Sequence, residues 1–542
     1  MCTAPIIKNM KNINRFLAIS FALLMLSGCS APKNPESSET SPAVTEASED
    51  IQTVLPVLSI ETKNSADDAI KFVTEPVDQY VAEQIASWTP FYKMPPAPYY
   101  EECSATLKDA DGETMLSPCD AQVKVRGNWT TVYPKKPLKI KFTEKQNLLG
   151  LNNGAEQKNW LLLAEYKDAS MLRNKAALYA AHEILSPDGL YSADSGLVNV
   201  EINGEYFGTY LLTESQQVSS ERVDISEPDK NYTGTDTGYF LEFDGYFTNE
   251  DELHSFPLDL ADNAPLKVYD GTDGETYMQT LPTDEDDAKK PVGITIKSTI
   301  NSQEQHDFIE NFVNNVYTIM YEAAYNDKAY IFDKDFKNIS ETSTISPQQA
   351  VENVVDVQSL ADMYIISELT CDADIYWSSF FMDADFGADG SKKLRFEAPW
   401  DFDSAMGNKD RCIDGTGFYA SNVVPDVNGG TENGGEYDTI NPWLVVLANE
   451  DWYQDVVRKK WSEAYDSGVF ERTFQLIEND KNTLKNDFEK NYQKWDNIRH
   501  NEDFENELSA PAAKCKNETE AADFLLEWLK KRVDFLNSQW HE

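Results

Sequence analysis

Residues 399–407 read Pro-Trp-Asp-Phe-Asp-Ser-Ala-Met-Gly and place two carboxylates, Asp401 and Asp403, among large aromatic side chains. A second acidic pair, Asp372 and Asp374, follows a long apolar run earlier in the chain. Buried anions are costly unless a cation pairs with them, whereas Mg²⁺ prefers a few carboxylate oxygens together with phosphate and water. The pattern predicts a metal–phosphate site. The alternative, a set of surface loop aspartates, is disfavoured because exposed acidic loops seldom carry two large aromatics.

A group of cations interrupts this acidic chain. The 542 residues include 93 acidic and 47 basic side chains, a net charge of −46. Residues 121–143 nevertheless contain no acid and several cations, namely Lys124, Arg126, Lys135, Lys136, Lys139 and Lys141. Alternation puts Lys124 and Arg126 on one face of a strand and Lys139 and Lys141 on one face of the next, so the cations converge if the strands pair. We predict a phosphate-binding face; the alternative is a solvated strand face.

The two features together predict polyphosphate chemistry. Cations hold the phosphates, carboxylates hold magnesium, and a further carboxylate orients the attacking hydroxyl, so catalysis is positioning and electrostatics. The sequence has neither a P-loop nor the glycine-rich loop of protein kinases. Its negative net charge disfavours binding to nucleic acid. Its five histidines lack the spacing of zinc ligands.

The N-terminus has the composition of a targeting segment. Three basic residues precede an apolar run, residues 16–26, which is too short for a comfortable transmembrane helix. The run ends in Leu-Ser-Gly before Cys29, which resembles a bacterial lipobox. We therefore expect a signal peptide over residues 1–28, a lipid on Cys29, and an extracytoplasmic, membrane-anchored lipoprotein; a plain secretion signal is the alternative. Residues 29–50, rich in Ser, Pro, Thr and Glu, predict a flexible tether.

The rest of the chain predicts an α+β fold of two lobes, with the acidic site near the cleft between them. Residues 51–245 form the strand-rich N-terminal lobe and residues 246–542 the helical C-terminal lobe. Strands are predicted within residues 54–60, 121–127 and 138–142, with a hairpin over 197–212 turned by Asn203-Gly204. Helices are predicted over residues 169–185, 302–324, 348–370, 442–465, 472–494 and 518–537.

Cysteine spacing allows one local disulfide. Cys103 and Cys119 flank a turn at residues 108–112 and are placed to close a hairpin disulfide in an oxidising compartment. The remaining cysteines, Cys371, Cys412 and Cys515, are odd in number, which leaves at least one thiol free and their pairing open.

Several ordered motifs resemble those of the spore coat protein H (CotH) kinase family. They stand at residues 125–128 (Val-Arg-Gly-Asn), 135–142 (Lys-Lys-Pro-Leu-Lys-Ile-Lys-Phe), 158–164, 168–174, 203–210 and 399–403. The similarity runs from about Leu55 to Trp540. It implies a divergent, two-lobed, kinase-like fold. It also implies Mg²⁺- or Mn²⁺-dependent transfer of a phosphoryl group from ATP to Ser or Thr of a surface or secreted protein.

The resemblance also implies roles for individual residues. Asp374 accepts the proton of the substrate hydroxyl; Asp401 binds magnesium with the support of Asp403. Arg126 and Lys139 face the phosphates, and Glu214 pairs with Lys139 to hold it in place. Similar sequences often read Asn-x-Asp where this one has Asp372-Ala373-Asp374. A carboxylate at Asp372 still binds magnesium, but two like charges this close raise one pKa.

Three function classes fit part of the sequence. The first is a surface-tethered protein kinase. The second is a non-catalytic surface module, an adhesin or assembly factor, that uses the same cleft; the aromatic richness suits sugar binding. The third is a glycoside hydrolase with two carboxylates, which has no need of a cationic strand face. Intact Asp374, Asp401 and Asp403 favour the kinase.

Overall fold

The computed structural model describes residues 52–64, 69–259, 264–269, 277–278, 293–375, 378–409, 413–421, 441–498, 504 and 507–542. The expected signal peptide, the lipidated Cys29 and the tether lie outside these ranges and stay predictions. Within the described residues, no helix combines the length and the apolar character that crossing a bilayer requires.

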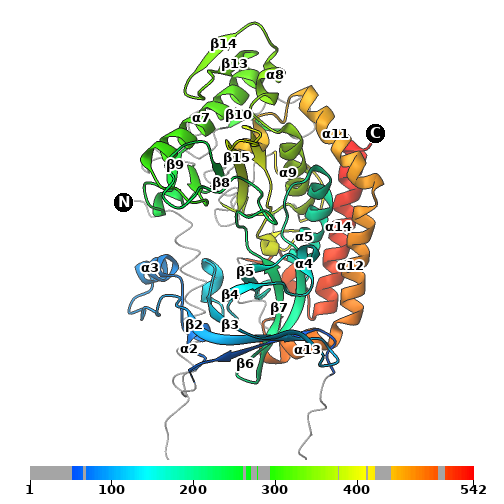
Figure 1. The fold of residues 1–542 in the computed structure, drawn as a ribbon. Coiled ribbons are helices and arrows are strands. Elements are labelled where there is room, and N and C mark those ends of the chain that lie inside the picture. The colour runs from blue at the N-terminus through cyan, green and yellow to red at the C-terminus, as the bar shows by residue number, and fades with distance from the viewer. Residues whose placement is uncertain are drawn as a thin grey trace, which may run out of the picture.

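The first part of the chain closes into a β-barrel (Figure 1). The strand order is β1-β2-β3-β4-β5-β7-β6, and all neighbours are antiparallel except β1 and β6, which close the barrel in parallel. Its strands are β1 (Val57–Thr62), β2 (Glu101–Lys108), β3 (Thr114–Val125), β4 (Leu138–Gln146), β5 (Gln157–Leu163), β6 (Ser195–Ile202) and β7 (Glu205–Glu214). The short helices α2 (Lys71–Thr74), α3 (Gln79–Trp88) and α4 (Leu151–Gly154) lie in the connections.

The barrel follows from the alternation in its strands. Val123, Ile140 and Trp160 are fully buried inside it and stand opposite one another across β3, β4 and β5. Successive strand residues point to opposite faces, so the lysines between these residues lie outside. The predicted hairpin is confirmed: Asn203 and Gly204 both have positive φ, 53° and 78°, which suits the turn that joins β6 to β7.

A second, antiparallel sheet forms the centre of the remaining chain, with strand order β16-β15-β8-β12-β9. Its strands are β8 (Gly238–Phe243), β9 (Ser255–Pro257), β12 (Gly293–Ile296), β15 (Phe380–Asp385) and β16 (Leu394–Phe396). Two small sheets pair β10 (Leu266–Lys267) with β11 (Tyr277–Met278), and β13 (Ala329–Phe332) with β14 (Ile339–Thr342). The C-terminal part is therefore not purely helical. The segment at 238–243, which we assigned to the N-terminal lobe, belongs to the second sheet.

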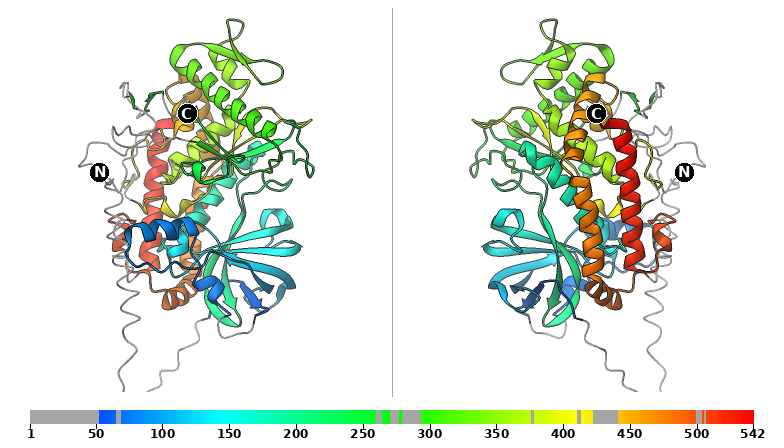
Figure 2. Two further views of the ribbon diagram at one scale, coloured as in Figure 1. Left: turned by 90° about the vertical axis from the view of Figure 1, so that its left-hand side faces the viewer. Right: turned by 90° about the vertical axis from the view of Figure 1, so that its right-hand side faces the viewer.

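Helices surround this sheet and extend along the barrel. They are α5 (Arg173–Leu185), α7 (Gln303–Asn326), α8 (Pro347–Glu352), α9 (Val357–Thr370), α10 (Pro442–Val445), α11 (Asp451–Asp466), α12 (Val469–Thr483), α13 (Lys485–Lys494) and α14 (Glu518–Trp540). Helix α9 contacts α5, α11, α14 and β16 and is buried along nearly its whole length. Helices α12 and α14 pack together and run from the second sheet down to the barrel (Figure 2).

Three predicted helices are each divided in two. Residues 348–370, predicted as one helix, form α8 and α9 instead. The side chain of Asp356 caps the start of α9 by accepting a hydrogen bond from the N–H of Ser359. The segment between the two helices bonds to β16: Leu394 donates to the carbonyl of Val354, and Asp356 donates to the carbonyl of Leu394. Sheet pairing therefore interrupts the helical periodicity. The predictions over 442–465 and 472–494 likewise span α10–α11 and α12–α13.

Helix α13 fixes the barrel to the helical part. The Asp487 carboxylate accepts hydrogen bonds from the side chain of Asn199 (2.7 Å) and the N–H of Leu55 (3.3 Å). Asn491 accepts from the N–H of Thr209 (3.1 Å). Because these polar groups are buried, their loss would leave unpaired donors inside the molecule.

The predicted disulfide between Cys103 and Cys119 is wrong. Cys103 stands opposite Ala121, and Cys119 stands opposite Ala105, so the two thiols are offset by two residues along the β2–β3 ladder. Both thiols are free.

Candidate functional site

The structure brings three of the predicted aspartates together. Carboxylate oxygens of Asp374, Asp401 and Asp403 all lie within 4.8 Å of one another. Asp374 follows the end of α9, whereas Asp401 and Asp403 follow β16. The two acidic pairs of the sequence therefore meet because the fold places the ends of these two elements side by side.

The loop that carries Asp401 is held in an unusual backbone conformation. Asp401 has φ 73° and ψ 54°, and Ala398 and Met406 also have positive φ, 60° and 48°. Residues other than glycine rarely adopt this left-handed backbone conformation, and the strain persists only where the surrounding structure enforces it. Here the Asn174 side chain accepts a hydrogen bond from the N–H of Phe402 (2.8 Å), and the N–H of Met406 donates to the carbonyl of Thr370 (2.7 Å). These bonds tie the loop to α5 and α9.

Asp372 supports the group from behind. It is fully buried, and its Oδ1 accepts a hydrogen bond from the N–H of Asp374 (3.1 Å). Burial, and then the charge of Asp374, raise the pKa of Asp372 well above its ordinary value. This confirms the expectation that the Asp-Ala-Asp sequence raises one pKa. Asp372 is not a member of the trio itself.

These aspartates fit a hard divalent cation. Burial, Asp403 and Asp374 raise the pKa of Asp401 to about 7, although Lys167 and Arg126 oppose the rise. The buried Oδ2 of Asp372 has no hydrogen-bond partner among the described residues. Carboxylate oxygens that repel one another, with a buried acceptor beside them, match the ligand preferences of Mg²⁺ and Mn²⁺. Asp401 and Asp403 would hold such an ion.

The predicted cationic face exists on β3 and β4. Lys124 stands directly opposite Lys139 on β3 and β4. Burial lowers the pKa of Lys139, and the neighbouring charges of Lys124, Arg126 and Lys141 lower it further. The predicted convergence of these cations is therefore confirmed.

Lys135 and Lys136 do not belong to this face. Both are buried. Lys135 donates a hydrogen bond to the carbonyl of Thr209 and lies over the ring of Tyr210, whereas Lys136 donates to the carbonyl of Thr131. Their ammonium groups donate to backbone carbonyls inside the fold, so these two cations of residues 121–143 lie outside the predicted phosphate-binding face.

Arg126 connects the cationic face to the acid cluster. Burial lowers its pKa, and the charge of Asp401 is the interaction that opposes this. The side chains of Arg126 and Lys139 have no hydrogen-bond or ion-pair partner among the described residues. Two partly buried cations without partners beside a group of aspartates are suited to bind an anion that bridges them, such as a phosphate.

The predicted pair of Glu214 and Lys139 is wrong. Glu214 forms a buried ion pair with Arg222 (3.0 Å) and accepts a hydrogen bond from the N–H of Asp194 (3.1 Å). Across the sheet, Lys139 stands opposite Leu161, and Leu161 opposite Thr213. Neighbouring residues on a strand point to opposite faces, so Glu214 lies on the face away from Lys139. Its role is structural.

Sequence reasoning missed Lys167. Its ammonium lies 3.1 Å from Oδ1 of Asp403 and donates a hydrogen bond to Oγ of Ser404 (2.6 Å). Burial alone would lower the pKa of Lys167, but Asp403, Glu507, Asp374 and Asp401 together raise it above its ordinary value. The available signal was a basic residue directly before the motif at 168–174, to which we gave no role. Asn174, within that motif, was missed in the same way.

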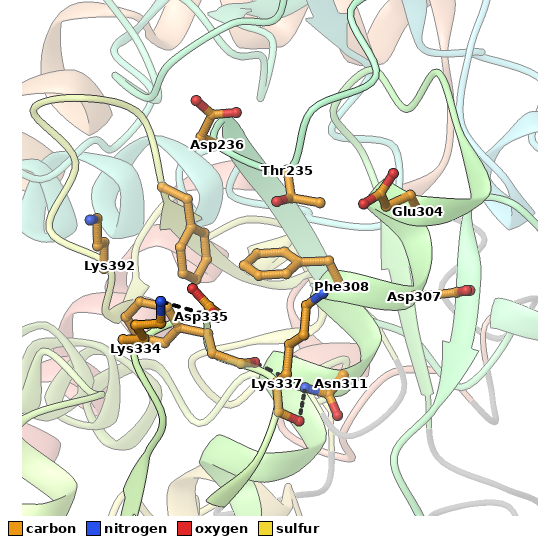
Figure 3. Close-up of a pocket in the computed structure, with 12 residues that line it drawn as sticks. Thr235, Asp236, Glu304, Asp307, Phe308, Asn311, Lys334, Asp335, Lys337 and Lys392 are labelled. Carbon is orange, nitrogen blue, oxygen red and sulfur yellow. Dashed lines mark hydrogen bonds and ion pairs between the residues drawn. The ribbon is translucent and has the colours of Figure 1, made fainter.

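A further set of residues lines a surface pocket (Figure 3). It is bounded by the start of α7, the turn between β13 and β14, and the segment after β15. Its lining mixes aromatic and charged side chains, including Phe308, Phe336, Asp335 and Lys337. No predicted site residue lines it, so the pocket is separate from the acid cluster.

Comparison with known proteins supports one family. No curated protein matches the chain. A family model described as CotH kinase protein matches residues 123–536, more than half of the chain. This range contains the cations of the strand face, the motif at 168–174 and the acid cluster. The chain belongs to the CotH kinase family.

Proposed function

We propose that the protein is an atypical protein kinase that transfers the γ-phosphoryl group of ATP to Ser or Thr of another protein. One observation carries the proposal: Asp374, Asp401 and Asp403 lie within 4.8 Å of one another, and Asp401 interacts electrostatically with the unpaired Arg126 of the barrel. Carboxylates for a metal ion and free cations for phosphates are the parts that phosphoryl transfer needs.

Each group has a role in the reaction. Arg126 and Lys139 hold the phosphates of ATP, and Asp374 accepts the proton of the acceptor hydroxyl. The hydroxyl oxygen forms a bond to the γ-phosphorus while the bond to the β–γ bridging oxygen breaks, and ADP leaves. Asp401 and Asp403, with Asp372 behind them, hold Mg²⁺ or Mn²⁺, which neutralises charge on the phosphates.

In this proposal the barrel and the helical part serve as the two lobes of a kinase-like arrangement. The nucleotide lies where Arg126 and Lys139 of the barrel face Asp401 of the second part. Separate elements then supply the two halves of the site, and their relative position sets the distance from phosphate to acceptor hydroxyl. Such positioning accounts for most of the catalysis of phosphoryl transfer.

We further propose that the protein works outside the cytoplasm as a lipoprotein anchored through Cys29. The basic start, short apolar run and Leu-Ser-Gly-Cys sequence support this. Its acceptors would then be surface or secreted proteins. Nucleic acid is disfavoured as a partner by the net charge of −46.

The test is transfer of label from γ-labelled ATP. The purified protein is incubated with candidate surface proteins in the presence of Mg²⁺ or Mn²⁺, and an Asp374→Asn variant is compared with it. A matched control is Asp335→Asn, which changes an exposed carboxylate at the separate pocket. We expect label on Ser or Thr with the wild type and the control, but none with Asp374→Asn. Equal label from wild type and Asp374→Asn refutes the assignment, and no transfer with any acceptor or cation supports the non-catalytic surface module instead.

A further inference from the structure

The acid cluster contains more negative charge than one metal ion balances. Carboxylate oxygens of Asp374, Asp401 and Asp403 lie within 4.8 Å of one another, and the buried carboxyl of Asp372 lies directly behind them, where it accepts a hydrogen bond from the N–H of Asp374. Protein kinases commonly meet a comparable excess with two Mg²⁺ ions bound beside the nucleotide. Here a side-chain cation lies against one of these carboxylates.

That cation is Lys167. Its ammonium lies 3.1 Å from Oδ1 of Asp403, with 9% of the lysine side chain and 14% of the aspartate side chain exposed. It also donates to Oγ of Ser404 (2.6 Å), which in turn donates to Oδ1 of Asp403 (3.2 Å). Lys167, Asp403 and Ser404 thus form a closed triangle of contacts at the side of the trio.

The backbone holds Lys167 in this position. The side chain of Asn408 donates to the carbonyl of Asp403 (2.7 Å) and to that of Lys167 (3.4 Å), so one side chain links both partners of the ion pair. The preceding carbonyl, that of Tyr166, accepts from the side chain of Asn497. The carbonyls before and after the Cα of Lys167 both accept hydrogen bonds, so its backbone position is fixed. Lys167 therefore differs from a mobile surface lysine that meets an acid by chance.

We propose that Lys167 takes the place of a second divalent cation, so that this site binds one metal ion and not two. The inference rests on the proposed function, because it assumes that the trio binds the metal of a phosphoryl-transfer site. A lysine ammonium is charged at neutral pH. Lodged against Asp403, it repels a second divalent cation and occupies the oxygen that this ion would need. The carboxylate of Asp401 and the other oxygen of Asp403 then remain for the single ion.

The experiment counts bound Mn²⁺ directly. Mn²⁺ alone is titrated into the purified full chain, and the free ion is measured by electron paramagnetic resonance. Each protein is also titrated with the additional substitution Asp401→Asn. The ions that this substitution abolishes are counted as bound at the cluster, and ions bound elsewhere on the protein are thereby subtracted. The wild type should bind one ion at the cluster. Lys167→Met should bind two, or bind a further ion at least about tenfold more tightly than the wild type does.

Two matched variants complete the test. Lys167→Arg keeps the charge and should bind one ion, and Asp403→Asn added to Lys167→Met should return the count to one. Two ions in the wild type, or Lys167→Met unchanged in number and affinity, overturn the proposal, and the wild-type count decides even if Lys167→Met does not fold. A count of one without phosphoryl transfer to any acceptor separates the two claims: the metal inference stands and the kinase assignment fails. No ion in the wild type overturns both.

Discussion

Replacing Asp401 with Asn is expected to stabilise the metal-free protein while it abolishes phosphoryl transfer. Burial, Asp403 and Asp374 raise the pKa of Asp401 from 3.8 to about 7. A folded-state pKa above the unfolded one adds stability that is complete below the unfolded value and is lost as the pH rises through the folded value. The metal-free wild type should therefore lose stability between about pH 4 and pH 7 that Asp401→Asn, which does not titrate, retains.

The size of this effect follows from the shift. Each pKa unit corresponds to about 1.4 kcal/mol. Between about pH 5 and about pH 8 Asp401 loses its proton in the folded wild type, whereas in the unfolded chain it is already ionised. The free energy of unfolding therefore falls by about 2.5 kcal/mol over this range. Partial solvent exposure of the site reduces this to about 2 kcal/mol. Divalent metal should reverse the order, because it binds the ionised carboxylate of the wild type and has one ligand fewer in the variant.

Urea denaturation followed by tryptophan fluorescence measures the difference. Wild type and Asp401→Asn are unfolded at about pH 5 and at about pH 8, each in EDTA and in Mg²⁺. Asp335→Asn serves as the control for removal of an exposed charge. The difference between the two proteins isolates Asp401 from other groups that titrate in the same range. If both proteins lose the same free energy on going to high pH in EDTA, the repulsion inferred at Asp401 does not exist.

Three further outcomes are expected. Arg126→Met should raise the KM for ATP about tenfold with little change in kcat, because one charge-assisted phosphate contact is lost; steady-state kinetics checks this, and an unchanged KM excludes Arg126 from the phosphate site. Arg222→Met should lower the free energy of unfolding by about 3 kcal/mol, since Glu214 is left buried and unpaired; a loss below about 1 kcal/mol in urea denaturation contradicts the structural role of this pair. Asn174→Ala should cost about 1–2 kcal/mol and lower kcat, since it removes the hydrogen bond to the Asp401 loop; full activity would show that the loop holds its strained conformation without it.

The sequence allowed prediction of the main parts of the site because their patterns are local. Alternation at residues 121–127 and 138–142 predicted the strand faces, and the β3–β4 register brings Lys124 and Lys139 together as expected. The acidic pairs predicted a cluster, which forms around Asp374, Asp401 and Asp403. Each of these inferences needed only side-chain spacing and charge.

Predictions that depended on non-local pairing failed. Glu214 was assigned to Lys139 because both lie in the strand-rich part, but the β4–β5–β7 register puts them on opposite faces. The second sheet was missed because its strands are short and separated by helices. Composition does not distinguish Lys135 and Lys136 from the cations of the strand face, and only their surroundings decide that they bond to buried carbonyls.

The amino-acid sequence by itself determined which chemistry is present: carboxylates in two close pairs, cations of one strand parity, and the motifs of a kinase family. Only the tertiary structure decided which groups meet. The face of a strand on which a side chain lies follows from the alternation along that strand. Which residue it meets on another strand depends on how distant elements pack, and so does the contact between Asp403 and Lys167, which precedes α5. Packing is set by the whole buried surface at once, and no local pattern records it.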